Sequence, residues 1–394
     1  MFREGEFDIE FWIEPPLLNA IYEDSRAIAG RLDLTAFISD VKALRDSLSS
    51  AIRPIQQKPG QYFTYAIDSS FPQTPLELVG GVLTVVSYGY VGQAGGVTDK
   101  YVTGTVIFED SSEVSKSIEL FSKVKERELA IRLLRDKKRG RRVIDMIILD
   151  GEIYIHPLPY NLPSKESSRK RIEEVVDRMI ALAEDTQTTL VGVVKRVRSR
   201  YLSIFLNRCL EVNDKLAMSL VLRRGEYANV GSFREILPRW IRVNYMDCEV
   251  KKGMGRDEAE RRLNEGLQNL ERVFTGDGGR LRGVSRIGDL NVLFYKAQNS
   301  SIATKVEVLD FAKIGHDKIV SYLASQTTST GYPYLLDLVD VYVRVNPMIL
   351  DYVRTLLLKN VGAGPGEQDV KEVVTSLLQL TNPQKAYLYK QLEG

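Results

Sequence analysis

The chain has 394 residues, with 54 Lys and Arg against 52 Asp and Glu, so its formal net charge is only +2. Its composition, 44% hydrophobic and 27% charged, is that of a globular protein and excludes disordered and collagen-like chains. The near-neutral charge gives no global reason to expect nucleic acid, so any electrostatic case depends on local clusters.

The chain has two histidines and two cysteines and neither a Cys-x-x-Cys nor a His-Glu-x-x-His spacing, so the usual zinc site, which needs about four soft ligands, is not expected. The cysteines, Cys209 and Cys248, lie far apart, which argues against a disulfide-stapled secreted protein and fits a reducing interior. The N-terminus carries acids where a signal peptide would carry cations, so we expect no export signal. Residues 78–98 are uncharged and long enough to cross a bilayer, but their glycines favour a β-hairpin.

The predicted elements begin with a largely helical segment over 17–53, which prolines close. Three stretches rich in Val, Ile, Thr and Tyr follow, separated by turn residues, and they predict an antiparallel meander at 62–67, 78–91 and 101–108. The spacing of apolar residues then predicts an amphipathic helix over 112–138.

A short apolar strand at 143–149, a helix at 165–185 and a second apolar strand at 189–195 complete the front half. A strand, helix, strand unit with a right-handed crossover places its two strands parallel. The front half is therefore predicted to be an α/β core with a mixed sheet.

Beyond residue 200 the pattern predicts a helix over 200–222, strands at 239–250, 289–297 and 304–308, and then helices to the end. We expect an N-terminal helical segment, a core, additional strands that complete the core, and a C-terminal helical region, at 1–60, 61–230, 231–310 and 311–394.

Two aspartates follow apolar strands at the point where each strand ends. Asp68 follows the strand at 62–67, and Asp150 follows the strand at 143–149. If these strands are neighbours and parallel, both carboxylates project from the same edge of the sheet. The alternative for each is a turn aspartate that accepts hydrogen bonds from its own loop.

The helix between these strands offers Glu126 and Glu128 as a third carboxylate. At 100° per residue, Glu128 falls within the apolar stripe and is expected to face the sheet, whereas Glu126 is expected to face solvent. Glu128 could instead pair with Arg132, four residues on, at the rim of that stripe.

Acidic side chains that meet at the carboxyl edge of such a sheet require a divalent cation, and carboxylate oxygens select Mg²⁺ or Mn²⁺. Two such ions about 4 Å apart can activate water and stabilise the leaving oxygen of a phosphodiester. The arrangement is ribonuclease H-like. Glycoside hydrolysis also uses paired carboxylates, but it needs no basic surroundings.

The surroundings of the acids are basic in sequence. The run 132–142 holds seven Lys and Arg, and the run 195–200 follows the last core strand at the same sheet end as the acids. Lys195, at the exit of that strand, is a candidate phosphate contact. The run 132–142 is equally explained as a solvated helix end, where cations also favour the helix dipole.

Six segments, in order from about residue 60 to 345, carry a resemblance to the NurA nucleases. Residues 66–70 resemble the first acidic motif, with Ser69 in place of glycine, and 149–153 are similar to the second. Residues 190–202 look like the Lys-Ser motif, and 214–227 like an Asp, aliphatic, Pro-Gly-Glu segment with Arg224 in place of proline. The last two are similar to the Phe-Tyr and Arg-Glu strands, at 290–311, and the Tyr-Pro helix, at 331–340.

The resemblance implies a ribonuclease H-like α/β fold with helical extensions at both ends, and a metal-dependent DNA nuclease. It implies cleavage of single strands and 5′ to 3′ degradation of duplex ends in DNA-end resection and homologous recombination. Asp68, Glu128 and Asp150 would bind two Mn²⁺ or Mg²⁺ ions, Lys195 would position phosphate, and Tyr332 would line the channel. The family works as a homodimer docked on the hexameric HerA ATPase, in the cytoplasm of archaea and bacteria, and this chain is taken to be archaeal.

One departure concerns a histidine that many members carry eight residues after the Tyr of the Tyr-Pro pair, where this chain has Asp340. An acid there could still bind metal or be inert. Together with Ser69 and Arg224, this departure leaves open a non-catalytic subunit that binds HerA and DNA. His316 lies in a Gly-His-Asp-Lys turn and is expected to be structural.

Overall fold

The strands of the computed structural model join in one mixed sheet. The structure describes residues 15–30, 34–56, 58–94, 97–109, 114–154, 166–346, 348–363 and 368–381. Within these ranges the strands are Ile52–Pro54 (β1), Thr64–Ser70 (β2), Leu76–Leu78 (β3), Gly81–Ala94 (β4), Val97–Glu109 (β5), Met146–Asp150 (β6), Thr189–Val194 (β7), Glu226–Ser232 (β8), Asn291–Lys296 (β9) and Thr304–Leu309 (β10). Their order is β1-β8-β9-β10-β7-β6-β2-β4-β3, and β5 pairs with β4 at the edge.

The middle of the sheet is parallel, and for β6 and β7 the crossover rule predicts this. Strand β6 pairs in parallel with β2 on one side and with β7 on the other, and the remaining pairs are antiparallel. All six residues of β7 are buried, because helices cover both faces of the sheet there. The predicted α/β mixed-sheet core with helical extensions is confirmed.

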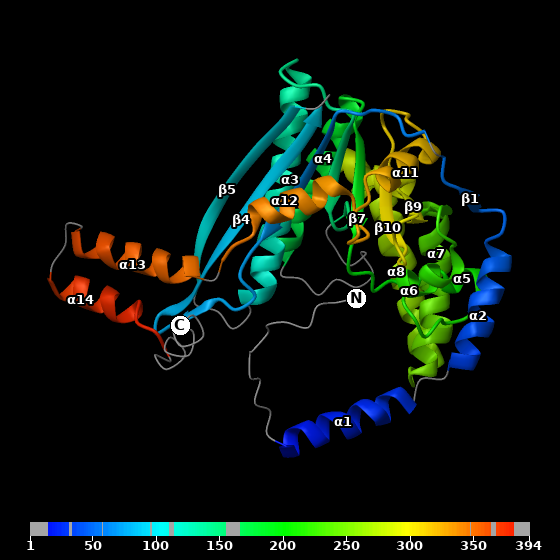
Figure 1. The fold of residues 1–394 in the computed structure, drawn as a ribbon, viewed down its shortest axis with the longest axis horizontal. Helices are drawn as coiled ribbons and strands as arrows, with labels where there is room; N and C mark the ends of the chain where they lie inside the picture. The colour runs from blue at the N-terminus through cyan, green and yellow to red at the C-terminus, as the bar shows by residue number, and fades with distance from the viewer. Residues whose placement is uncertain are drawn as a thin grey trace, which may run out of the picture.

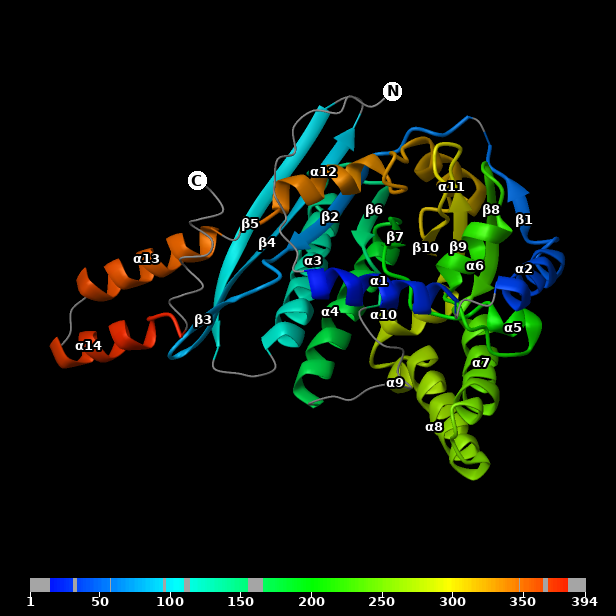
Figure 2. The same ribbon diagram turned by 60° about the horizontal axis from the view of Figure 1, so that its bottom comes forward.

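Helices cover the two faces unequally. The longer helices are Pro15–Gly30 (α1), Leu34–Ser47 (α2), Val114–Lys138 (α3), Glu166–Asp185 (α4), Asp214–Val221 (α6), Phe233–Val243 (α7), Arg256–Phe274 (α8), His316–Ser325 (α11), Tyr334–Val343 (α12), Met348–Ala363 (α13) and Gln368–Leu377 (α14). The shorter ones include Ser203–Leu206 (α5) and Arg282–Ser285 (α10). One apolar core joins one face to α3, α4, α7 and α8, and a second joins the other face to α11 and α12 (Figures 1 and 2).

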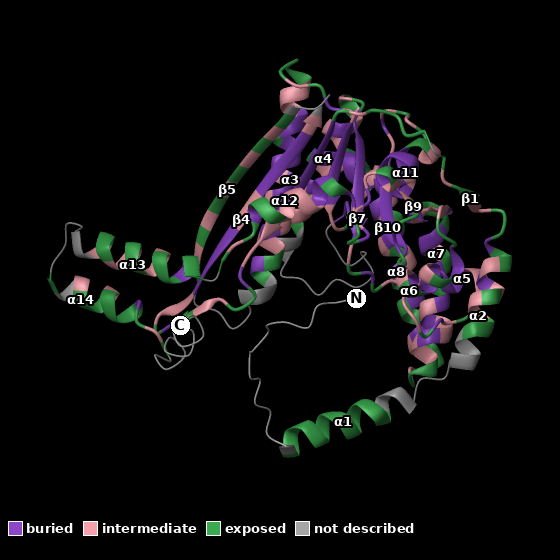
Figure 3. Cartoon of the chain, in the orientation of Figure 1, coloured by how far each residue is buried: buried purple, intermediate pink, exposed green. Residues whose placement is uncertain are grey.

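The two ends of the chain lie outside this layered core. Helix α1 is separate from the sheet, and α13 and α14 project beyond the long β4–β5 hairpin (Figure 1). Buried residues concentrate in the central strands, whereas α1 is exposed along its described side chains and β5 alternates between half-buried and exposed residues (Figure 3).

The uncharged stretch at 78–98 forms the end of β3, a turn and β4, with the start of β5 in its last residues, so the hairpin prediction is confirmed. In the described part of the chain, no helix combines the length and apolar character needed to cross a membrane.

Two predictions for the back half are wrong. The expected strand at 239–250 is the end of α7 and a π-helical turn, Asn244–Glu249. Ser232 and Glu235 form a capping box that starts α7, and its apolar residues at helical spacing are buried, so burial overrides β propensity. The expected helix at 200–222 is two helices, α5 and α6, joined by an irregular segment, and β8 was missed.

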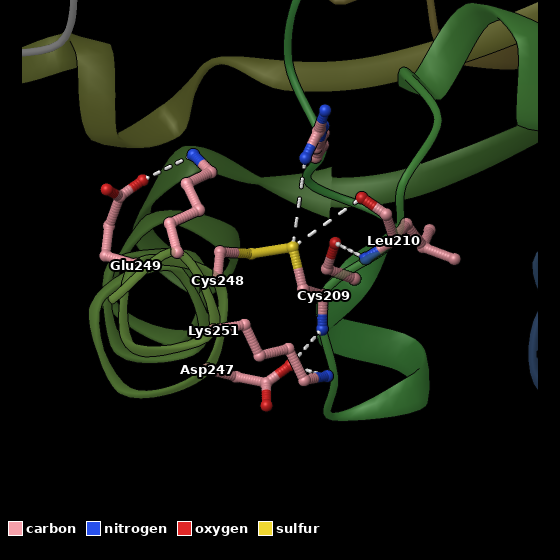
Figure 4. Close-up of a disulfide and its surroundings, with 9 residues drawn as sticks. Cys209, Leu210, Asp247, Cys248, Glu249 and Lys251 are labelled. Atoms are coloured by element: carbon pink, nitrogen blue, oxygen red, sulfur yellow. Dashed lines mark hydrogen bonds and ion pairs between the residues drawn. A yellow bond between two sulfur atoms is a disulfide. The ribbon is translucent and has the colours of Figure 1, made fainter. Parts of the chain in front are cut away.

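The prediction of two separate thiols is also wrong, because Cys209 and Cys248 form a disulfide (Figure 4). It ties the segment after α5 to the π-helical turn, 39 residues apart in sequence. Beside it, the Cys209 backbone N–H donates to Asp247 at 2.6 Å, and Lys251 pairs with the same carboxylate at 2.8 Å. Distance along the sequence could not exclude the bond, since folding sets which residues meet.

Removing this cross-link should destabilise the α5–α8 region. We expect the double variant Cys209→Ser, Cys248→Ser to lose about 2 to 4 kcal/mol of unfolding free energy, because closing a loop restricts the unfolded chain. Denaturant titration without reductant measures the loss. Dithiothreitol should reduce wild-type stability similarly and leave the variant unchanged; equal stability of all samples would contradict the prediction.

Candidate active site

Asp68, Asp150 and Lys195 meet at one edge and one face of the sheet. They leave the carboxyl ends of three adjacent parallel strands, β2, β6 and β7. The residue two positions before each of them is buried against α11 and α12. Because side chains alternate between the two faces of a strand, all three point to the α12 side. The pairing of Ile67 with Leu149 makes Asp68 and Asp150 the next neighbours in register. The predicted meeting of these acids is confirmed.

Asp68 is the most buried of the three, at 3% exposure. Burial, followed by the charges of Asp150 and Glu126, raises the pKa of Asp68 to about 9, against the smaller lowering effects of Lys195 and the Ser69 N–H. The Ser69 backbone N–H donates to this carboxylate at 2.7 Å, the one hydrogen bond it receives within the described ranges. The site therefore holds a carboxylate whose negative charge lacks full compensation.

Lys195 supplies the nearest positive charge. Its Nζ lies 2.9 Å from Oδ2 of Asp150. Burial lowers the pKa of Lys195, but Asp150, Asp68 and Asp340 outweigh that effect, so the net pKa is raised and the lysine stays charged. Lys195 is thus held at the acidic pair by electrostatic attraction.

Tyr332 covers this lysine. Lys195 Nζ lies 5.5 Å from the centre of the Tyr332 ring, and Lys215 Nζ lies 5.0 Å from it. Lys215 also donates to the Tyr332 hydroxyl at 2.7 Å and to the Lys195 carbonyl at 3.0 Å. Lys215 was not predicted from the sequence, although it lies directly after Asp214 in the segment 214–227 that carries part of the resemblance.

The third carboxylate near the pair is Glu126, so the predicted orientation of Glu128 is wrong. Glu126 is fully buried and accepts a hydrogen bond from the Ser69 hydroxyl at 2.5 Å. Lys123 and Arg127 also contact it. The Glu128 side chain is 40% exposed and pairs with Lys125 at 2.8 Å. Glu126 approaches from the α3 face and reaches Ser69, the residue next to Asp68.

The error came from treating α3 as a helix with one buried stripe. The helix packs on β2 and β4 along one side and on α4 along another, so two stripes are buried. The stripe through Ile118, Ser122 and Glu126 runs at four-residue spacing and includes polar residues. An assignment from the apolar residues alone therefore misses the polar stripe that carries Glu126.

The two basic runs lie at different ends of the sheet. Lys137 donates to the Ile144 carbonyl and to the Thr188 hydroxyl, which precede β6 and β7, so the run 132–142 lies at the amino ends of the strands. It cannot contact a phosphate at the acids. The run 195–200 starts at the acidic edge, and Arg196 and Arg198 are exposed there.

Asp340 and His316 lie outside the closest contacts. Asp340 on α12 pairs at 3.0 Å with Arg344, the residue after that helix, and the charge of Asp340 contributes to the raised pKa of Lys195. His316 lies in a cleft of about 410 Å³ with Asp310, and burial lowers its pKa. A metal-binding role for Asp340 therefore stays a prediction.

Asp68 and Asp150 are the residues that could hold a divalent cation. Their donor set consists of hard carboxylate oxygens, and the raised pKa of Asp68 shows that cationic charge here would be favourable. Among the described residues, however, no group of three or more His, Cys, Asp or Glu side chains is arranged to hold a metal. Glu126 is held toward Ser69 and Arg127, which leaves the aspartate pair as the primary donors.

Comparison with known proteins identifies a family. The model of the NurA domain matches residues 63–345. The crystal structure of the NurA nuclease from Sulfolobus solfataricus is similar at 13% identity and a TM-score of 0.56, over 90% of this chain and 100% of that chain. A structure of NurA bound to dAMP and manganese is similar at 10% identity and a TM-score of 0.52, over 89% and 98%. No curated protein sequence matches.

Asp68 should destabilise the metal-free protein at neutral pH. Its folded pKa of about 9 exceeds its ordinary value of 3.8, so the stability present below pH 3.8 is lost as pH rises toward 9. In EDTA, Asp68→Asn should therefore be more stable than wild type at pH 7, by up to about 4 kcal/mol. The gain should shrink toward pH 4 in thermal unfolding. A less stable variant at pH 7 would contradict the assigned environment.

Proposed function

Because the chain belongs to the NurA family, we propose that it is a Mn²⁺- or Mg²⁺-dependent deoxyribonuclease. The observation that carries the proposal is the pair Asp68 and Asp150 at the carboxyl ends of adjacent parallel strands, with Lys195 on one carboxylate. The family's solved members include NurA with manganese and with dAMP. Two ions per site are part of the proposal.

Each residue has a separate task in this reaction. Asp68 and Asp150 would hold the ions, which when bound activate water and stabilise the leaving oxygen. Lys195 lies between Asp150 and the Tyr332 ring, so it can exchange its contact with Asp150 for a phosphate oxygen. Lys215 fixes the Tyr332 hydroxyl and thereby the wall of the site. Glu126 adds negative charge close to Asp68.

DNA is the proposed substrate, cut internally in single strands and degraded 5′ to 3′ from duplex ends. Arg196 and Arg198 follow Lys195, are exposed, and have no ion-pair partner among the described residues. Free arginines beside the reacting atoms suit a phosphate backbone.

Homodimer formation and docking on a HerA-type hexameric ATPase complete the proposal. The edge strand β5 exposes Val102, Val106 and Phe108, and α1 exposes a further apolar group: Leu17, Leu18, Ile21 and Tyr22. An apolar edge strand is a surface that proteins normally cover. We assign β5 to a second copy of the chain.

The alternative is a non-catalytic subunit that binds DNA and the ATPase. It is favoured by the departures at Ser69, Arg224 and Asp340. Calorimetric titration of Mn²⁺ separates the two functions, because a subunit without catalysis has no need to bind the ion. Absence of binding at micromolar to millimolar Mn²⁺ would favour the non-catalytic subunit.

The dimer assignment predicts that a charged substitution on β5 changes the oligomeric state. We expect light scattering to give a dimer for wild type and a monomer for Val106→Lys, because a charge on the apolar edge must be desolvated on pairing. The control is Glu260→Lys, at an exposed position of α8 away from β5 (Figure 2), and it should leave the dimer intact. A monomeric wild type would contradict the assignment, and failure to co-elute with a HerA-type ATPase would contradict docking.

The nuclease proposal predicts metal-dependent cutting that requires the aspartate pair. Wild type should cleave 5′-labelled single-stranded and blunt duplex DNA with Mn²⁺ or Mg²⁺ and not with EDTA. Asp150→Asn should reduce the rate by roughly 10²-fold or more while DNA binding and folding persist, because it removes a charged donor that the transition state uses. Full activity of Asp150→Asn would remove this residue from the site.

A matched pair on α3 provides the control. Glu126→Gln should reduce cleavage by roughly 10-fold or more, whereas Glu128→Gln should stay within about twofold of wild type, because only Glu126 lies near Asp68. A larger loss of cleavage in Glu128→Gln than in Glu126→Gln would instead support the prediction from sequence that Glu128 faces the sheet. If folded wild type cuts no DNA, even with the ATPase present, the non-catalytic subunit is favoured.

A further inference from the structure

The turn that follows Asp150 crosses to the opposite face of the sheet over a glycine. Gly192 on β7 pairs with Leu149 on one side and with Glu307 on the other. A Cβ at Gly192 would lie 2.6 Å from the Gly151 carbonyl oxygen and 3.0 Å from the Ile153 nitrogen. Position 192 must therefore lack a side chain, since any larger residue would push this turn away.

A buried ion pair lies beside that crossing. Lys305 and Glu307 on β10 are 3% and 2% exposed, and their charged groups are 3.2 Å apart. The second oxygen of Glu307 accepts a hydrogen bond from the Ile153 backbone N–H at 3.2 Å. Lys305 also lies 4.9 Å from the Tyr201 ring and faces the buried Asp214. The carboxylate thus reaches from β10 past β7 to the turn after β6.

Two cations on α3 hold the same turn from its carbonyl side. Lys123 Nζ donates to the Asp150 carbonyl at 2.7 Å, and Arg127, which is fully buried, donates to the Glu152 carbonyl. Three charged side chains from two other elements therefore fix the backbone over Asp150–Ile153. A buried ion pair adds little net stability because both charges must be desolvated, so this placement calls for another explanation.

We propose that Glu307 is a positioning residue for Asp150, acting through its hydrogen bond to the Ile153 backbone. The inference rests on the proposed nuclease function for its catalytic consequence. Asp150 stands at the last position of β6, and its last link to the neighbouring strand is the Gly151 N–H, which donates to the Val193 carbonyl at 2.9 Å. A carboxylate that must meet a cation together with Asp68 requires its backbone to be held within a fraction of an ångström. Glu307 provides that restraint without contacting substrate.

A matched pair of double variants isolates this hydrogen bond. Lys305→Met with Glu307→Gln removes both charges and keeps an oxygen that can accept from Ile153. Lys305→Met with Glu307→Leu removes both charges and the acceptor. Both variants lose the ion pair equally, so the electrostatic cost is shared, and thermal unfolding verifies that each is folded. The full chain is used with Mn²⁺ and a single-stranded oligonucleotide.

Three measurements are compared between the two variants. We expect the leucine variant to show at least tenfold faster hydrogen exchange at the peptide containing Ile153. We also expect at least tenfold lower kcat with KM for the oligonucleotide within about twofold, and weaker Mn²⁺ binding. The glutamine variant should stay near wild type in all three.

The outcomes separate the inference from the proposed function. Equal hydrogen exchange at the Ile153 peptide in the two variants would overturn the positioning role, whether or not the protein cuts DNA. Faster exchange with equal kcat and equal Mn²⁺ affinity would also overturn it, because the turn would then be held without consequence for Asp150. Wild type that cuts nothing would instead overturn the nuclease function, while exchange and Mn²⁺ affinity would still decide whether Glu307 positions Asp150.

Discussion

The parallel pairing of β2 with β6 is the constraint on which the rest of the site depends. It places Asp68 and Asp150 side by side and on the same face, where the two like charges repel and burial disfavours the charge of Asp68. Compensation must come from elsewhere, and Lys195 supplies it from the next parallel strand. Tyr332 and Lys215 then enclose that lysine. The positions of these side chains are thus consequences of one strand pairing that is electrostatically unfavourable without a cation.

The part of the site that could be predicted from sequence is the part that follows from strand ends. Asp68, Asp150 and Lys195 each follow a short apolar run, and the handedness of the crossover makes the runs before Asp150 and Lys195 parallel. The place of Asp68 also depends on the strand order, which puts β2 beside β6 and which the sequence left as a condition. Glu126 could not be placed in this way, because α3 is buried on two sides and its sheet-facing stripe includes Ser122 and Glu126 itself. The spacing of apolar residues identifies a buried helix face only where the residues on that face are apolar.

The remaining features depend on contacts between residues far apart in sequence. Glu307 meets Ile153 across 154 positions, and Tyr332 meets Lys215 across 117. The disulfide joins two segments whose local patterns give no hint of proximity. For α7 a local signal existed, the Ser232 and Glu235 capping box, and it was outweighed by aromatic and β-branched residues that suggested a strand. A cap defines where a helix begins, so it should outrank propensity when the two conflict.

The departures from the family pattern bear on whether the site is catalytic. Ser69, which stands where glycine was expected, donates its hydroxyl to Glu126 and its backbone N–H to Asp68, so it connects two carboxylates. Asp340 still contributes negative charge that helps keep Lys195 protonated. Arg224 lies exposed in the turn before β8, away from these contacts. A subunit without catalysis would have no reason to keep Asp68 buried at 3% exposure beside two other acids, because replacing one of them would remove the repulsion. Retaining that cost argues that the charges serve a bound cation.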